Sequence, residues 1–194
     1  MRHLTLPFAA LIALSACGEA PDNSSDKIEV TGQSAAKVGQ PAPAEARGQD
    51  FVSSVLGSYA FSLESARLAE QKADRAAVKQ FATQLRSDLE SSQAELTRLA
   101  SGAGLRMEPT PGETHQTDLA VLSSTRGAPL ERAFAEQQME GLTALVGLLR
   151  AYKNGGDNLD LKAWADKAQR VVGERLMDVQ TLNGELQEAA DKPS

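Results

Sequence analysis

Apolar residues recur at every third or fourth position along most of the chain beyond residue 50. This spacing places them on one face of an α-helix, and it predicts long helices over about residues 50–73, 74–101, 129–152 and from 158 onward. A weaker pattern predicts a short helix over 114–122. The apolar faces include Phe51, Val55, Tyr59, Leu63, Val78, Phe81, Leu85, Leu89, Phe134, Leu142, Leu145, Leu149, Trp164, Val172 and Leu182.

Glycine, proline and short polar residues separate these segments. Gly102 and Gly104 are typical of a helix C-terminus, and Pro129 suits the first turn of the next long helix. Asp74 and Asn158 are candidate N-caps. The pattern leaves open whether the first two helices are separate or continue through a kink at Asp74.

Four apolar helical faces predict an all-α fold, an up-and-down bundle of four main helices plus a short crossover helix. We assign residues 50–190 to this bundle domain and residues 191–194 to a C-terminal tail. In such a bundle we expect the first and last helices to lie side by side and antiparallel.

The N-terminus has the layout of a bacterial secretory signal. A basic start, Met1-Arg2-His3, precedes a mainly apolar run from Leu4 to Ala16 that is too short for a permanent membrane span. The run ends in Leu14-Ser15-Ala16-Cys17, which resembles the lipobox of exported lipoproteins. Small residues before the cysteine admit a peptidase, and the thiol can form a thioether to diacylglycerol. We therefore predict a signal peptide over residues 1–16 and lipidation of Cys17.

Lipid on Cys17 predicts membrane anchoring, because each buried methylene of an acyl chain such as palmitate contributes about 0.8 kcal/mol. In the sorting that the lipobox resemblance implies, an aspartate after the cysteine favours retention in the inner membrane. Gly18 occupies that position, so we expect the outer membrane, with the protein facing the periplasm. The alternative is an ordinary signal peptide followed by a chance cysteine.

Residues 17–49 contain the lipidated cysteine and a segment rich in glycine, proline, serine and glutamine, without a sustained helical or strand period. Such a composition buries too little apolar area to offset the entropy of ordering the chain. We predict a disordered tether that holds the bundle away from the membrane.

The charge balance narrows the range of partners. The formal net charge is −6, and loss of Arg2 with the signal peptide would make it −7. An acidic surface repels phosphates, so we expect no nucleic-acid binding. A single cysteine excludes a disulfide framework within the chain.

Several short motifs resemble a known family. They are Phe51-Val52, Glu64, Arg67-Leu68-Ala69-Glu70-Gln71-Lys72-Ala73, Val78-Lys79-Gln80-Phe81-Ala82, Leu161-Lys162-Ala163-Trp164-Ala165 and Gln180-Thr181-Leu182. Together they are similar to domain-of-unknown-function family 4142 over roughly Phe51 to Leu182. The resemblance implies an exported protein with a ferritin-like bundle and unknown activity.

The chain departs from this family at its histidines. The resemblance places an Asp-His pair at Asp88-Leu89 and further histidines at Leu142 and Arg175. Of an expected Glu-x-Glu pair in the first helix, only Glu64 is present. A ferritin-like di-iron site needs Glu-x-x-His pairs, so we expect no metal site, no cofactor and no catalytic residues. We interpret the remaining histidine of the mature chain, His115, as an exposed or helix-start residue.

Glu64, Asp88 and Arg175 lie near the apolar faces and form the one candidate polar cluster. They could reach solvent from the edge of each face, form a partly buried ion pair, or bind a ligand. We expect Arg175 to pair with Glu64, at a similar height in the bundle, or with Asp88. The leading functional hypothesis is a non-enzymatic envelope module that binds a partner protein or supports the envelope. The alternatives are a small-ligand-binding bundle and, last, a degenerate ferritin-like oxidase.

Overall fold

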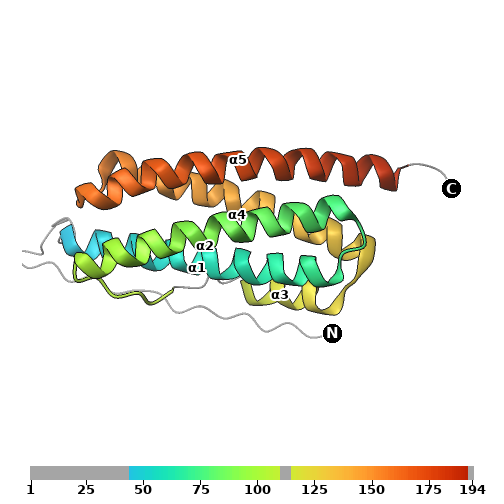
Figure 1. Ribbon diagram of the computed structural model, residues 1–194, viewed down its shortest axis with the longest axis horizontal. Coiled ribbons are helices and arrows are strands. Elements are labelled where there is room, and N and C mark those ends of the chain that lie inside the picture. The colour runs from blue at the N-terminus through green and yellow to red at the C-terminus, as the bar shows by residue number, and fades with distance from the viewer. Residues whose placement is uncertain (1–43, 110–114, 192–194) are drawn as a thin grey trace, which may run out of the picture. The chain divides into compact units, whose positions relative to one another are not determined.

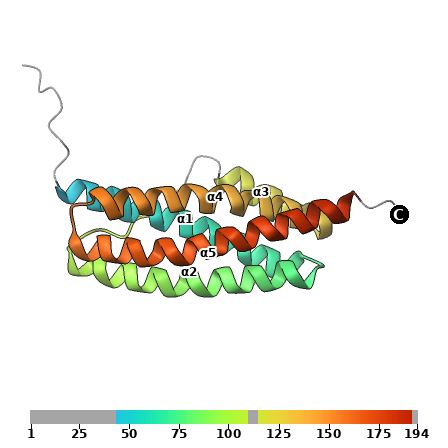
Figure 2. The same cartoon turned by 90° about the horizontal axis from the view of Figure 1, so that it is seen from above.

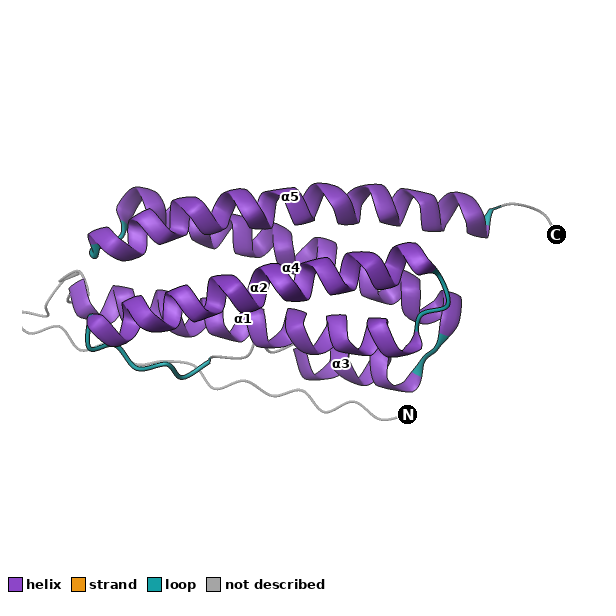
Figure 3. Cartoon of the chain, in the orientation of Figure 1, coloured by secondary structure: helices purple, strands orange, loops and turns teal. Residues whose placement is uncertain are grey.

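The computed structural model describes residues 44–109 and 115–191, and this part of the chain forms five α-helices (Figure 1). They are α1 (Ala44–Lys72), α2 (Ala76–Gly102), α3 (His115–Ser124), α4 (Gly127–Gly155) and α5 (Leu159–Ala190). Figure 3 shows helices joined by loops and turns over the described residues. The predicted all-α bundle of four main helices with one short helix is confirmed. The predicted signal peptide, Cys17, the predicted tether up to residue 43 and residues 192–194 lie outside the described residues.

The four long helices form two antiparallel pairs, α1 with α2 and α4 with α5 (Figure 2). Helix α4 also packs against α1, and α5 against α2, so that α1 and α5 lie diagonally across the bundle. Helices α2 and α4 run in the same direction, and their connection, which contains α3, spans the bundle lengthwise (Figure 1). One long crossover between two antiparallel pairs is the connectivity of ferritin-like folds. The expectation that the first and last helices are neighbours was therefore wrong.

Helices α1 and α2 are two separate antiparallel helices joined by a turn, and not one helix with a kink at Asp74. Helix α1 ends at Lys72 and α2 begins at Ala76. The predicted N-cap Asp74 is wrong, because the N-cap position is Arg75 and its side chain makes no capping hydrogen bond. At the start of α5 the prediction was correct, since the Asn158 side chain accepts a hydrogen bond from the backbone N–H of Leu161 at 3.0 Å.

Helix α1 begins at Ala44, six residues before the predicted Asp50. Its first turns are tied to distant parts of the chain that local periodicity cannot reveal. The Gln49 side chain both accepts from the backbone N–H of Arg106, at 2.8 Å, and donates to its carbonyl oxygen, also at 2.8 Å. Arg47 lies 4.0 Å from the carboxylate of Asp157. These contacts extend the helix into the segment that we had assigned to the tether.

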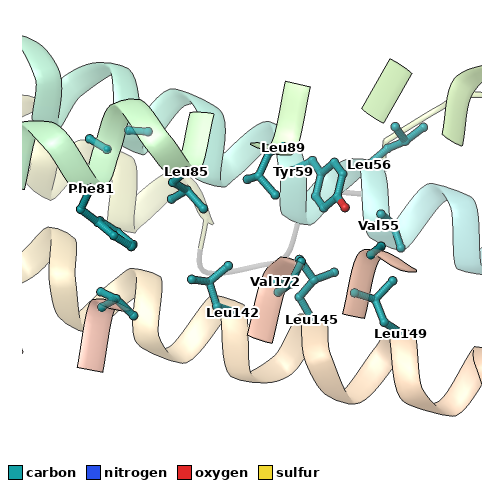
Figure 4. Close-up of a cluster of buried hydrophobic side chains, with 14 of the residues drawn as sticks. Val55, Leu56, Tyr59, Phe81, Leu85, Leu89, Leu142, Leu145, Leu149 and Val172 are labelled. Carbon is teal, nitrogen blue, oxygen red and sulfur yellow. The ribbon is translucent and has the colours of Figure 1, made fainter. Parts of the chain in front are cut away.

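The interior is a single apolar core to which all five helices contribute. Side chains of α4 such as Leu142, Leu145 and Leu149 point toward α1 and α2, where they meet Tyr59 and Leu89 (Figure 4). All five of these residues are at least 98% buried. Full burial of a leucine contributes about 1.5–3 kcal/mol relative to exposure, so this core dominates the stability of the bundle.

Helix α3 covers part of the groove between α1 and α4 (Figures 1 and 2). Leu122 is its fully buried residue, and Lys72 of α1 donates to the backbone carbonyl of Ser123 at 2.5 Å. The opposite groove, between α2 and α5, has no comparable covering helix among the described residues. None of the described helices combines the length and the apolar character needed to cross a membrane.

Candidate functional site

An ion pair of two predicted site residues joins helices α2 and α5. Arg175 Nε lies 3.4 Å from Asp88 Oδ2, and the two side chains are 16% and 24% exposed. Arg175 also lies 3.0 Å from Asp178 and 3.8 Å from Glu174, both on its own helix. The structure therefore matches the expected pairing of Arg175 with Asp88, in a partly buried position.

Glu64, the third predicted member of this cluster, is not part of it. Its carboxylate lies 2.7 Å from the guanidinium of Arg67, one turn along α1, and is 44% exposed. The expectation of a Glu64–Arg175 pair assumed that α1 and α5 are adjacent. Because they are diagonal, residues at the same height on the two helices are separated by the core.

The positions at which the family resemblance places histidines belong to the core and to this ion pair. Leu89 and Leu142 are 1% and 0% exposed, and Figure 4 shows their side chains within the apolar cluster. Arg175 occupies the third position. At the level of Asp88 the interior of the bundle is therefore apolar, and the Asp88–Arg175 ion pair lies at its edge.

One turn beyond Asp88, hydrogen bonds of Tyr59, Ser92 and Trp164 join α1, α2 and α5. Tyr59 Oη and Ser92 Oγ are 2.9 Å apart, and Trp164 Nε1 donates to the Ser92 carbonyl oxygen at 3.3 Å. Burial raises the pKa of Tyr59 to about 12, although the hydrogen bond with Ser92 lowers it somewhat. The Tyr59 hydroxyl is therefore protonated at neutral pH, and it shares a hydrogen bond with Ser92 that links α1 to α2.

Two hollows lie along the groove between α2 and α5. The larger, about 380 Å³, lies beside Arg175, and the smaller, about 120 Å³, lies beside Asp88. The larger is lined by Ala77, Gln80, Phe81, Gln84, Arg175, Asp178, Thr181, Leu182 and Glu185. Its polar side chains could form hydrogen bonds with a ligand, but the guanidinium is already balanced by carboxylates.

A buried carboxylate that the sequence analysis did not single out lies at the α1–α2 turn. Glu131 of α4 is 1% exposed, and its Oε1 accepts from the backbone N–H groups of Asp74 and Arg75 at 2.8 and 2.7 Å. Its Oε2 lies 3.3 Å from Arg75 Nε. Glu131 thus supplies the cap that the α2 N-terminus lacks locally. Its spacing of three and seven residues from Phe134 and Gln138 could have placed it on the inward face.

Another hollow lies between the N-terminal part of α1 and the C-terminal end of α4. Its volume is about 330 Å³, and it is lined by Arg47, Asp50, Phe51, Ser54, Leu148, Ala151, Tyr152, Gly155 and Gly156. We call it the α1–α4 pocket. The rings of Phe51 and Tyr152 stack with centroids 3.8 Å apart and planes 9° apart. The Tyr152 hydroxyl donates to Asp157 Oδ1 at 2.6 Å, and burial together with this carboxylate raises the pKa of Tyr152.

His115 lies at the start of α3, as expected, and is half-buried with its ring stacked on Phe61 at a centroid distance of 4.4 Å. No group of three or more histidine, cysteine, aspartate or glutamate residues in the described ranges is placed to hold a metal ion. Cys17, the predicted lipidation site, lies outside those ranges.

Comparisons with known proteins give one informative result. No curated protein and no solved structure matched the chain. A family model described as domain of unknown function, DUF4142, matches residues 33–182, which include α1 to α4 and most of α5. This match begins before the first of the quoted motifs, ends with the last of them at Leu182, and covers well over half of the chain. The chain therefore belongs to the DUF4142 family.

Proposed function

We propose that this chain is a lipoprotein of the cell envelope, anchored through lipid on Cys17, whose bundle is a non-enzymatic binding or structural module. The sequence Leu14-Ser15-Ala16-Cys17 after a basic start and an apolar run supports the anchor. Gly18 supports the outer membrane, with the bundle in the periplasm.

The proposal that the bundle is non-enzymatic rests on the side chains that occupy its interior at the level of Asp88. Leu89 and Leu142 fill the interior with hydrocarbon, and Asp88 is engaged with Arg175. A catalytic acid or metal ligand needs a side chain that is available to a substrate or ion. Asp88 is the partly buried acid in this layer, and it is paired with Arg175, which also contacts the exposed carboxylates of Glu174 and Asp178.

The anchor is tested by labelling cells with radioactive palmitate and comparing the protein with its Cys17→Ser variant. The parent should carry label and fractionate with membranes, because thioether formation requires the thiol. The variant should carry none and accumulate as uncut or soluble protein. Equal membrane fractionation and equal processed mass of the two proteins would contradict the lipoprotein assignment.

The binding part is tested by crosslinking in intact cells. A photoreactive residue is placed at Gln84, beside the hollow between α2 and α5, at Ala151, beside the α1–α4 pocket, or at Glu136 as an exposed control away from both. A binding module should give one adduct of defined mass from one groove and none from Glu136. Adducts of equal yield from all three positions would contradict a specific partner surface.

A second candidate function, binding of a small ligand, is favoured by the α1–α4 pocket. Ligand sites typically have volumes of about 300–1,000 Å³ and apolar walls with a few polar groups. The pocket, at about 330 Å³, has Phe51, Leu148 and Tyr152 in its wall and Arg47 and Asp50 at its polar side.

A further inference from the structure

The α1–α4 pocket exists because α3 covers only one part of the groove between these helices. Helix α3 packs on the later turns of α1, where Phe61 meets His115 and Lys72 reaches Ser123. The pocket lies at the other end of the groove, beside the first turns of α1. Small residues there, Ala151, Gly155 and Gly156, leave space that larger side chains would fill.

The aromatic wall of the pocket is held in place before any ligand binds. Phe51 is stacked on Tyr152, and Tyr152 is fixed by its hydrogen bond to Asp157. Gly156 packs directly against the same tyrosine, since a Cβ there would lie 2.7 Å from its ring. A preformed wall spares a ligand the cost of ordering side chains.

The charges at the pocket are unequally matched. Arg47 lies 4.0 Å from Asp157 Oδ2, so one cation faces one buried anion, whose side chain is 6% exposed. Asp50, which lines the pocket and is exposed, makes no ion pair or hydrogen bond with any residue in the described part of the chain. Within the described part of the chain, the pocket therefore presents one unbalanced negative charge beside an apolar wall.

From this combination we infer that the α1–α4 pocket binds a small organic amine with an apolar body. The hydrocarbon part packs against Phe51, Leu148 and Tyr152, and the ammonium group lies at Asp50. A carboxylate of the same shape would meet the unbalanced charge of Asp50, and an alcohol would gain no ion pair. This inference names the ligand class for the second candidate function and rests on it.

The single tryptophan reports on this pocket. Trp164 packs edge-on against Phe51, with ring centroids 6.0 Å apart, so a ligand that shifts Phe51 should alter tryptophan fluorescence. The mature chain is titrated separately with hexylamine, hexanol and hexanoate at neutral pH. Hexylamine should bind saturably with a dissociation constant of about 1 mM or below, as a ligand of a few heavy atoms allows. Hexanol and hexanoate should bind at least about threefold more weakly.

Two variants and a control locate the site. Asp50→Asn should weaken hexylamine binding about three- to tenfold, which is the size of effect expected from losing one exposed ion pair. Hexanol binding should be unchanged, because the alcohol forms no ion pair with Asp50. Ala151→Phe, at an exposed position of the lining, should abolish binding of all three compounds by filling the pocket. Glu136→Gln, at an exposed acid fifteen residues before Ala151 on α4 and outside the pocket lining, should change nothing.

The inference would be overturned if hexylamine did not bind, if it bound no more tightly than hexanoate, or if Ala151→Phe left its binding unchanged. Circular dichroism of each variant shows whether the bundle is intact, so that lost binding is not mistaken for unfolding. None of these results bears on the lipid anchor, which the palmitate labelling tests independently.

Discussion

The carboxylate of Glu131 on α4 caps the N-terminus of α2 through the backbone N–H of Arg75, at 2.7 Å, across the bundle. The same oxygen also binds the backbone N–H of Asp74, and the second oxygen faces the Arg75 guanidinium. One buried side chain thus satisfies the backbone donor of the N-cap residue Arg75 and that of Asp74 in the turn before it. It also locks the α1–α2 turn onto the second helical pair.

Glu131→Ala should destabilise the protein by about 2–4 kcal/mol. It leaves two backbone donors without their partner and removes a charge-assisted contact from a buried position. Urea denaturation followed by circular dichroism measures the change. The matched control is Glu136→Ala on the same helix, which is exposed and should cost under about 0.5 kcal/mol. Equal effects of the two substitutions would contradict the capping role.

The Asp88–Arg175 pair should contribute less, because both partners are partly exposed. We expect Arg175→Met to destabilise by about 1–2 kcal/mol, between the values typical of exposed and buried pairs. A double-mutant cycle of Asp88→Asn with Arg175→Met should show coupling of about 0.5–1.5 kcal/mol. The same cycle with Glu64→Gln should show none, since Glu64 pairs with Arg67. Coupling of Glu64 with Arg175 would contradict the diagonal placement of α1 and α5.

The helices could be predicted from sequence because each buries a continuous apolar face, and a period of three or four residues is a local signal. Stops at Gly102 and Gly104 were predictable for the same reason. Helix α2 ends at Gly102, and Gly104 has a φ of +70°, a left-handed conformation that glycine adopts without strain.

The order of the helices around the bundle was not predictable from these local patterns. Whether α5 neighbours α1 depends on the path of the crossover between α2 and α4, and the apolar faces alone fit either arrangement. That ambiguity explains why Asp88 was correctly considered as a partner of Arg175 while Glu64 was wrongly included. Glu131 was overlooked because its partners are backbone groups of a distant turn, which leave no mark in the sequence around it.

The raised pKa of Tyr59 predicts how stability changes in alkaline solution. In the unfolded chain the hydroxyl ionises near its ordinary pKa of 10, whereas in the folded protein the pKa is about 12. Between these values the unfolded state has lost the proton and the folded state retains it. Stability therefore falls as pH rises from 10 to 12, by up to about 2–3 kcal/mol from this group.

The Tyr59→Phe variant isolates that contribution. It should be less stable than the parent by about 1 kcal/mol at neutral pH, because the hydrogen bond with Ser92 is lost. The difference should shrink or reverse by pH 12, since phenylalanine has no proton to lose. Urea denaturation at a series of pH values measures both effects. Parallel stability curves for the two proteins would show that Tyr59 ionises normally.

Two glycines of α4 should respond in opposite directions to alanine. Gly127, at the buried start of the helix, has a φ of +56°, and a Cβ there would lie 2.7 Å from Asp74 Oδ2. Gly127→Ala combines left-handed backbone strain with a steric conflict at the turn that Glu131 caps, and it should destabilise by about 1–3 kcal/mol.

Gly147 is exposed in the middle of the same helix, and a Cβ there meets nothing within 4 Å. Gly147→Ala should stabilise by about 0.5–1 kcal/mol, because alanine loses less backbone entropy in a helix. Thermal or urea denaturation of the two variants provides the comparison. If Gly127→Ala left the stability unchanged, the start of α4 could relax away from the α1–α2 turn. That result would contradict the role of Glu131 as a rigid link between the two helical pairs.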